Sequence, residues 1–356
     1  MAAQNKLLIT GVTGYIGFQT LIIALERNHN VRAVVRSQAN IAKLRSMNAR
    51  VAKSQDDGVL EFAIVPNFLA PNDITSALDG ITEIIHLASP LAAQADDYER
   101  EIIAPAVDMV TVVLEAATQT PSVRRLVITS SCVTLVPFEW NFAPDSERTY
   151  SADDINSHPT QPYGNPMEAY WASKALARIA TRDFVNTKKP HFDYINLLPS
   201  VVIGPDTRIP SDGTAKPGDL TAEARGSVLA SALDASLNSP FPFVGVPVHV
   251  RDVARAHVDA AVPAEGQTEI AGNAEYILSS DAPEGVVWDR DTPAIARKYF
   301  PEEVANGTLP LEGSLTAIKW RLDTSKTEEA FGWKMTTFEQ TMKEMLLQYI
   351  DLKNGR

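Results

Sequence analysis

Residues 7–17 read Leu-Leu-Ile-Thr-Gly-Val-Thr-Gly-Tyr-Ile-Gly, an apolar strand followed by a loop with three glycines spaced as G-x-x-G-x-x-G. Glycines after a first strand allow a tight turn and let the backbone come close to a pyrophosphate. The helix that follows presents its N–H groups to the phosphates. The loop therefore predicts a dinucleotide site, although its spacing differs from the G-x-G-x-x-G of many dehydrogenases. The loop residues expected to bind the cofactor are Gly11, Thr13, Gly14, Tyr15, Ile16 and Gly17.

The rest of the chain repeats the order of apolar strand and helix that this loop begins. Unbroken Val/Ile/Leu runs alternate with longer stretches of helical periodicity, which is typical of a buried parallel sheet covered by helices. The expected strands are residues 6–10, 31–35, 60–65, 83–87, 126–130, 194–198, 246–250 and 275–278. The expected helices are residues 16–28, 102–117, 168–185 and 338–352.

This order of elements predicts an α/β fold, a Rossmann-type doubly wound parallel sheet with a smaller C-terminal substrate-binding lobe. After residue 205 the chain becomes rich in Pro, Gly, Ser and Thr, and its periodicity weakens. We therefore expect residues 1–204, joined by 246–280, to form the nucleotide-binding domain. Residues 205–245 and 281–356 are expected to form most of the smaller lobe.

The end of the second expected strand indicates which dinucleotide the loop binds. NAD sites place an acidic residue there to bind the ribose 2′-hydroxyl. This strand ends in Val35 and Arg36, and no carboxylate follows until Asp56. Arg36 and Lys43 can instead pair with a 2′-phosphate through charge-assisted hydrogen bonds. We expect NADPH, the alternative being that both cations are merely solvated at the surface.

Tyr170 and Lys174 form the first candidate catalytic pair. Asn165 is a suitable N-cap, Pro166 fits the first helical position and Glu168 the third, so a helix should begin here. Residues four apart share a helix face, which brings the phenol and the ammonium together. Carbonyl reduction needs a proton donor, and a tyrosine with an ordinary pKa of about 10 exchanges its proton poorly at neutral pH. We expect the ammonium to lower the pKa of the phenol.

A serine precedes this pair at the end of a buried strand. Residues 126–131 read Leu-Val-Ile-Thr-Ser-Ser, and open α/β sheets bind ligands at the carboxyl ends of their strands. Ser131 can donate a hydrogen bond to a substrate oxygen beside the tyrosine; the alternative is a simple turn residue. A second pair with the same spacing, Tyr349 and Lys353, ends the last expected helix and follows no such strand. We interpret it as packing plus a surface charge.

The composition narrows the classes of partner. The 356 residues include 32 basic and 44 acidic side chains, for a net charge of −12, which argues against nucleic acid and acidic membrane surfaces as partners. The single cysteine, Cys132, can form no internal disulfide, and no residues have metal-ligand spacing. No apolar run reaches the roughly 18 to 20 residues that span a bilayer. We expect no secretory leader, no metal and a cytoplasmic location.

Together these motifs resemble the short-chain dehydrogenase/reductase superfamily, in its extended branch, over nearly the whole chain. The matching motifs are Thr10-Gly11-x-x-Gly14-x-x-Gly17, Thr129-Ser130-Ser131, Tyr170-x-x-x-Lys174 and Leu198-Pro199-Ser200-x-Val202-x-Gly204-Pro205. Within that branch, Ala88-Ser89-Pro90 and Pro105-Ala106-Val107 are similar to the dihydroflavonol reductase and fungal methylglyoxal (carbonyl) reductase group.

The resemblance implies a role for each matched position. Tyr170 would be the acid/base, Lys174 would bind the nicotinamide ribose, and Ser131 would polarise the carbonyl. The further cofactor contacts that it implies are Arg36, Lys43, Asn67, Phe68, Leu87, Ala88, Pro199 and Val202. Two positions depart from the pattern. Asn67 replaces the acidic residue usual at the adenine, and Ala106 stands where epimerase relatives often have asparagine.

Apolar residues near these motifs are candidates for the substrate pocket. They are Leu91, Phe138, Trp140, Phe241 and Phe243. Such a pocket would favour hydrophobic or aromatic carbonyl compounds; plain packing under a long loop is the alternative. His86 and His257 are interpreted as core histidines rather than catalysts.

The function that the sequence favours is NADPH-dependent reduction of aldehyde or ketone carbonyls to alcohols, by a ketoreductase that is a monomer or a homodimer. Two alternatives stay open. One is an NAD-dependent epimerase or dehydratase of nucleotide sugars, which Arg36 and Ala106 disfavour. The other is a non-catalytic NADPH-binding regulator, which the complete Ser–Tyr–Lys set disfavours.

Overall fold

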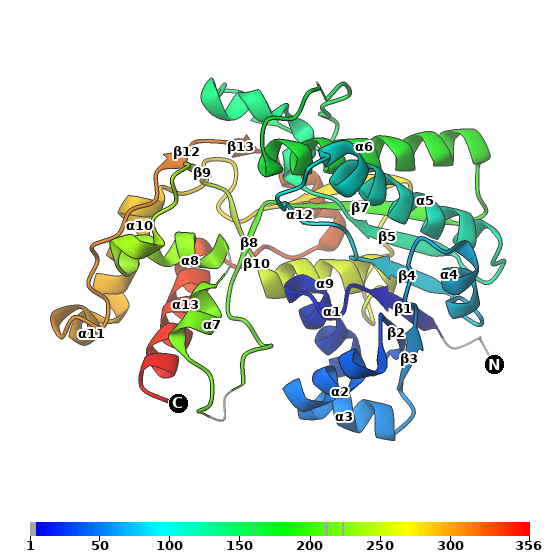
Figure 1. The fold of residues 1–356 in the computed structure, drawn as a ribbon, viewed down its shortest axis with the longest axis horizontal. Helices are drawn as coiled ribbons and strands as arrows, with labels where there is room; N and C mark the ends of the chain where they lie inside the picture. The colour runs from blue at the N-terminus through cyan, green and yellow to red at the C-terminus, as the bar shows by residue number, and fades with distance from the viewer. Residues whose placement is uncertain (1–4, 160, 211–212, 223) are drawn as a thin grey trace.

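The computed structural model describes residues 5–159, 161–210, 213–222 and 224–356 (Figure 1). Its centre is a sheet of seven parallel strands in the order β11-β7-β5-β4-β1-β2-β3. These strands are β1 (Lys6–Thr10), β2 (Asn30–Val35), β3 (Leu60–Ile64), β4 (Glu83–His86), β5 (Arg125–Thr129), β7 (Asp193–Pro199) and β11 (Ala274–Leu278). The predicted Rossmann-type sheet is therefore confirmed.

Helices cover both faces of this sheet, because alternate strand residues point to opposite sides. The first face carries α1 (Tyr15–Glu26), α2 (Gln38–Met47), α3 (Ala49–Asp56), α9 (Val250–Ala261) and α12 (Ser325–Phe331). The second face carries α4 (Pro71–Ala77), α5 (Ala104–Thr118) and α6 (Pro166–Lys188). Leu7 and Ile9 lie in the core under α1 and α9, whereas Leu8 lies in the core under α5. Two apolar layers thus hold the sheet rigid beneath its carboxyl edge.

A smaller lobe with its own apolar core follows β7 (Figure 1). Its helices are α7 (Pro217–Thr221), α8 (Ala224–Leu229), α10 (Trp288–Tyr299), α11 (Pro301–Ala305) and α13 (Phe338–Lys353). Three pairs of short parallel strands lie outside the central sheet. They are β8 (Val201–Ile203) with β10 (Pro247–His249), β9 (Phe243–Val244) with β12 (Ala317–Ile318), and β6 (Thr149–Tyr150) with β13 (Arg321–Leu322). The strand predicted at 246–250 thus pairs with β8, outside the central sheet. None of the helices in the described ranges has the length and apolar character needed to cross a bilayer.

One segment that the sequence assigned to the lobe packs on the sheet instead. Phe331, at the end of α12, lies in the same core as α1. Its ring meets Tyr276 of β11 edge to face, with the centroids 5.5 Å apart. β11 is the edge strand, so α12 covers apolar surface that the helices of the N-terminal half leave exposed.

Candidate active site

The glycine loop joins β1 to α1 with no room for side chains at two positions. Gly11 has a φ of +73°, and a Cβ there would lie 2.9 Å from the amide nitrogen of Ala88. A Cβ on Gly17 would lie 2.1 Å from the carbonyl oxygen of Gly11. Gly14 caps α1 without a side-chain bond, and the first turn holds no acidic residue. The first backbone N–H groups of α1 are therefore available to bind an anion. The glycine loop and this helix start fit the pyrophosphate of a dinucleotide.

The residues predicted to bind the adenosine end follow β2 and β3. Arg36 comes directly after β2, and Lys43 lies on α2. Both side chains are exposed, and neither forms an ion pair within the described part of the chain. Asn67 follows β3, where its side chain accepts a hydrogen bond from the Leu69 amide at 3.1 Å. Phe68 stacks on His86 of β4, with the ring centroids 5.5 Å apart. The parallel strands therefore bring these positions to one edge of the sheet.

The residues predicted to bind the nicotinamide end follow the central strands. The amides of Leu87 and Ala88, after β4, both donate to the Thr10 hydroxyl at 3.1 Å, which ties this segment to the end of β1. Pro199 ends β7 and is buried, and Val202 lies half-buried in β8. These positions flank the candidate catalytic residues at the carboxyl edge, where open α/β sheets bind ligands.

The side chain of Tyr15 is engaged by the lobe. Its hydroxyl donates to the carbonyl oxygen of Gly204 at 2.6 Å. The guanidinium groups of Arg225 and Arg208 lie over its ring, 4.5 and 5.5 Å from the centroid, and Asp206 binds both arginines. Tyr15 therefore offers a cofactor its backbone rather than its phenol. No residue near Tyr15 in the sequence signals this contact, because Gly204 lies 189 positions further along the chain.

The helix predicted to carry Tyr170 and Lys174 begins where expected. The Asn165 side chain accepts hydrogen bonds at 3.0 Å from the amides of Met167 and Glu168, and a proline occupies the first turn of α6. The Lys174 ammonium lies 5.7 Å from the centroid of the Tyr170 ring. One capped helix start thus places both side chains at the carboxyl edge of the sheet.

Ser131 completes this set from the end of β5. It caps a short 3-10 turn (Cys132–Leu135), where its Oγ accepts from the Val133 amide at 3.3 Å. Its hydroxyl also lies beside the phenol of Tyr170 and acts to lower the pKa of that phenol. The neighbouring Ser130 faces away, and its buried Oγ has no hydrogen-bond partner in the described part of the chain. The second serine of the pair is therefore the one beside the tyrosine.

The pKa values of the pair differ from the sequence prediction. Burial raises the pKa of Tyr170 to about 12, although the hydrogen bond from Ser131 acts in the opposite direction. Burial lowers the pKa of Lys174 to about 8. The predicted lowering of the phenol pKa by the ammonium is wrong for this structure. The reason is that the ammonium turns to Ser89, while burial removes water from around the phenol and so disfavours its charged form.

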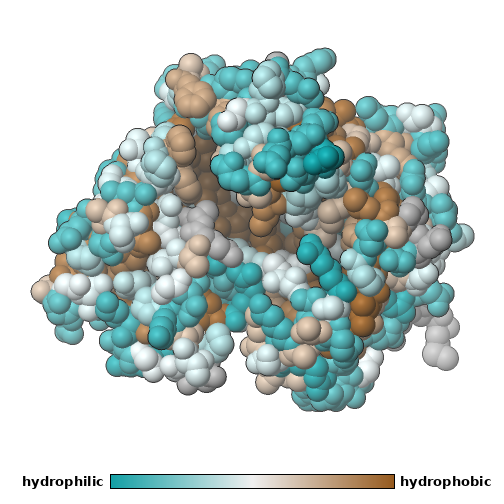
Figure 2. Space-filling model, viewed as in Figure 1, coloured by the Kyte–Doolittle hydropathy of each residue, from teal (hydrophilic) through white to brown (hydrophobic). Residues whose placement is uncertain are grey.

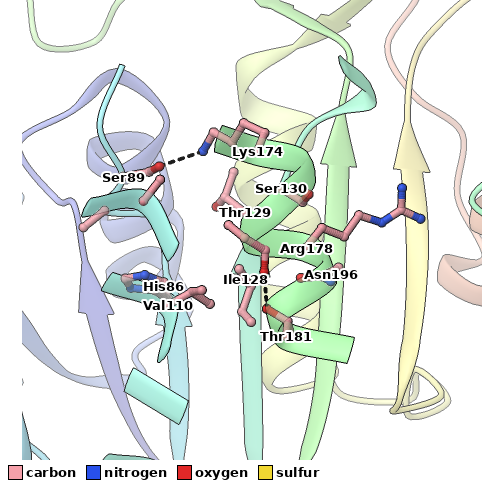
Figure 3. A pocket seen from close by; sticks show the side chains of 13 residues that line it. His86, Ser89, Val110, Ile128, Thr129, Ser130, Lys174, Arg178, Thr181 and Asn196 are labelled. Atoms are coloured by element: carbon pink, nitrogen blue, oxygen red, sulfur yellow. Dashed lines mark hydrogen bonds between the residues drawn. The ribbon is translucent and has the colours of Figure 1, made fainter. Parts of the chain in front are cut away.

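A polar cavity lies beneath Lys174, between the sheet and helices α5 and α6 (Figure 3). Lys174 closes its top and donates to the Ser89 hydroxyl at 3.0 Å, an interaction to which the sequence assigned no role. His86 lies lower in the cavity, with its Nδ1 2.9 Å from the Thr10 hydroxyl. His257, on the other face, bonds to Thr129 at 2.7 Å. Both histidines are hydrogen-bonded in the core, as predicted.

The predicted pocket residues divide into buried and exposed groups. Trp140 is 7% exposed, donates from its indole N–H to the Tyr150 hydroxyl at 2.9 Å, and packs on Trp320 with centroids 5.1 Å apart. It belongs to the core, so the packing alternative holds for Trp140. Leu91 and Phe241 are 72% and 68% exposed.

The remaining aromatic candidates are intermediate. Phe138 is half-buried, edge to face with Trp171 of α6, and Phe243 is half-buried in β9. Figure 2 shows a hollow with apolar walls between the lobe and the sheet. An exposed apolar hollow of this kind is typical of a ligand site.

Two further predictions concern residues away from this edge. Tyr349 is 9% exposed in the lobe core, which agrees with the packing role predicted for the second Tyr–Lys pair. Across the described ranges, no group of three or more His, Cys, Asp or Glu residues is arranged to hold a metal ion.

Comparison with known proteins decides the family. The model of the NAD dependent epimerase/dehydratase family matches residues 7–270. The chain belongs to this family. The resemblance to the extended short-chain dehydrogenase/reductase branch is thereby confirmed, and the matched range runs from β1 to just before β11.

Several members of this family are similar to the chain over its length. Ketoreductase CTB6 of Cercospora nicotianae is 34% identical over 98% of this chain and 96% of its own. The putative NADPH-dependent methylglyoxal reductase GRP2 of Candida albicans is 27% identical over 98% of this chain and all of its own. Yeast methylglyoxal/isovaleraldehyde reductase Gre2, solved with NADPH, superposes with a TM-score of 0.77 at 21% identity, covering 99% and 100% of the two chains. The last comparison shows a shared fold.

Proposed function

We propose that this protein reduces aldehyde or ketone carbonyls to alcohols with NADPH. The observation that carries the proposal is the Ser131–Tyr170–Lys174 set, which lies at the carboxyl edge of the sheet beside a glycine loop that has no room for a side chain at Gly11 and Gly17. Relatives named as ketoreductases and as an NADPH-dependent methylglyoxal reductase, aligned over nearly the whole chain, support the same reaction class. Arg36, where an NAD site would have an acidic residue, and Ala106, where epimerase relatives often have asparagine, weigh against a nucleotide-sugar epimerase.

The chemistry divides between the cofactor and the side chains. Bound NADPH supplies the hydride to the carbonyl carbon. Tyr170 gives its phenolic proton to the carbonyl oxygen, and its raised pKa means that the phenol carries this proton at neutral pH. Ser131 donates a hydrogen bond to the same oxygen. Lys174, charged at neutral pH despite its lowered pKa, contributes a positive charge where negative charge develops.

The first test concerns the reaction itself. Purified protein should consume NADPH in the presence of at least some members of a panel of aldehydes, aryl ketones and keto esters, with alcohol formed in equal amount. Absence of consumption with the whole panel, by folded protein that binds NADPH, would contradict the proposed function.

Cofactor preference should depend on Arg36, with Lys43 secondary. Arg36→Asp replaces an exposed cation with a carboxylate that repels a 2′-phosphate and can accept from a ribose 2′-hydroxyl. We expect the KM for NADPH to rise at least about tenfold, since a charge-assisted hydrogen bond contributes about 1.5–3 kcal/mol, while the KM for NADH falls. Steady-state kinetics with both cofactors give the result. Equal wild-type kcat/KM for NADPH and NADH would refute this role of Arg36.

Substrate choice should depend on the exposed apolar residues rather than on Trp140. Phe241→Ala should change the ratio of kcat/KM between a bulky aryl ketone and a small aldehyde by about 10-fold or more, since burial of a Phe side chain contributes about 1.5–3 kcal/mol. Leu347→Ala, at an exposed apolar residue of α13, is the control and should leave the ratio unchanged. Identical ratios in wild type and Phe241→Ala would remove Phe241 from the substrate site.

A further inference from the structure

We propose that Ser89 is a positioning residue for the reaction: its hydroxyl holds the Lys174 ammonium at the carboxyl edge of the sheet and keeps it charged there. The effect on catalysis rests on the proposed function. The effect on the ammonium itself does not, and it can be measured in the protein without substrate.

The contact joins two elements that are far apart in sequence. Lys174 projects from α6 and donates to Ser89 Oγ at 3.0 Å (Figure 3). Lys174 is only 7% exposed, so water has little access to its ammonium. Within the described residues, Ser89 is the one hydrogen-bond acceptor of this ammonium, and no carboxylate forms an ion pair with it. One hydroxyl thus replaces much of the solvation that the charge has lost.

Ser89 is held in place by its neighbours in the chain. The amides of Leu87 and Ala88 both donate to Thr10, and the backbone of Gly11 lies against that of Ala88. The segment after β4 is therefore fixed to the end of β1. The Ser89 hydroxyl can therefore accept a hydrogen bond from Lys174 without the entropic cost of ordering a mobile loop.

The groups around the ammonium offer no alternative negative charge. His86 faces the cavity from β4, and burial, with the Lys174 charge adding to it, lowers its pKa to about 3, so it stays neutral. Tyr170 on the same helix stays protonated because burial raises its pKa. Arg178, also on α6, turns to Glu275, 3.0 Å away.

The remaining walls of the cavity are uncharged. Thr129 lies at the end of β5 and Ser130 directly after it, α5 contributes Ala106 and Val110, and β7 contributes Asn196. The nearby carboxylate of Glu275 is bound by two arginines and the Asn196 amide, so its charge is already neutralised. The state of the ammonium therefore depends on the Ser89 hydroxyl more than on any ion pair.

The size of the effect follows from the hydrogen bond. Burial already lowers the pKa of Lys174 to about 8. A hydrogen bond to the charged form favours that form, so its removal lowers the pKa further. A drop of about one unit would leave roughly a tenth of the ammonium charged at pH 8, compared with about half in the wild type, a fivefold loss.

The direct test is an NMR titration of the Lys174 side chain. The protein is labelled with 13C-lysine, the Lys174 13Cε signal is assigned by its loss in Lys174→Met, and its shift is followed between pH 6 and 11 in wild type and Ser89→Ala. We expect the midpoint to fall by about one unit in Ser89→Ala. Ser130→Ala, which removes a hydroxyl without a described partner from the same cavity, should leave the midpoint unchanged.

A second pair of variants separates the hydroxyl from packing. Ser89→Thr keeps the hydroxyl and Ser89→Val has nearly the same volume without it, so only Val should lower the midpoint. This pair replaces Ser89→Ala if that variant does not fold. Equal midpoints for Thr and Val, or an equal shift in Ser130→Ala, would overturn the proposal.

Kinetics then connect the ammonium to the reaction. In wild type, kcat/KM for NADPH-dependent reduction should fall as pH rises through about 8, because a group with a lowered pKa loses its charge there. In Ser89→Val this alkaline limb should move about one unit lower, with Ser89→Thr close to wild type. If no carbonyl is reduced at all, the proposed function fails while the titration still decides the role of Ser89. An unmoved limb despite a moved midpoint would overturn the positioning role.

Discussion

Tyr170→Phe should reduce kcat for carbonyl reduction by about 10²–10⁴-fold, the usual contribution of a positioned proton donor. Phenylalanine keeps the aromatic ring, so the packing of this half-buried side chain should survive and NADPH should still bind. Burial keeps the proton on this phenol at neutral pH, and the Ser131 hydroxyl lies beside it. Turnover with a reactive aldehyde, together with NADPH binding by fluorescence, gives the measurement.

The chain contains its own control for this substitution. Tyr349 has a lysine four residues later, like Tyr170, but it lies in the lobe core on α13. Tyr349→Phe should leave kcat within about twofold of wild type, because its hydroxyl is far from the carboxyl edge of the sheet. A folded, NADPH-binding Tyr170→Phe protein with wild-type turnover would refute the assignment, as would equal losses in both variants.

Glu275→Gln should destabilise the protein by about 3–5 kcal/mol, the usual cost of removing one partner of a buried ion pair. Glu275 on β11 is 4% exposed and accepts from Arg178, whose side chain is fully buried, at 3.0 Å. Arg182 and Asn196 bind the same carboxylate. A neutral amide would leave the Arg178 charge without a counter-charge. Urea denaturation followed by circular dichroism measures the loss.

Glu61 is the matched control at the opposite edge of the same sheet. It lies on β3 and pairs with Lys6 at 2.8 Å and Arg32 at 3.0 Å, but its side chain is 47% exposed. Exposed ion pairs contribute little because water and salt screen them, so Glu61→Gln should cost less than about 1 kcal/mol. Similar losses in the two variants would mean that burial does not decide the strength of these pairs.

The sequence predicted the parts of this molecule that depend on local pattern. The glycine loop, the apolar strands and the capped start of α6 each follow from residues close together in the chain. Ser131, Tyr170 and Lys174 could be proposed as one site because parallel strands and their helices meet at one edge. Their positions in the structure agree with that expectation.

What escaped prediction depends on contacts between distant segments. Nothing near Tyr15 signals its bond to Gly204, and nothing near Lys174 signals Ser89. Trp140 has the composition of a pocket wall, yet packing on Trp320 places it in the core. The pKa of Tyr170 likewise depends on burial by the whole fold, which a four-residue spacing cannot report.

The position of β11 has a consequence for how the protein forms during synthesis. This edge strand comes from residues 274–278, whereas its neighbour β7 ends at residue 199 and the matched family range ends at 270. A nascent chain that has emerged from the ribosome only as far as residue 270 contains Arg178 but lacks Glu275, whose carboxylate neutralises it. Domains generally fold as units, the N-terminal ones first, during synthesis. Here the seven-stranded sheet can be completed only after residue 278 has emerged from the ribosome.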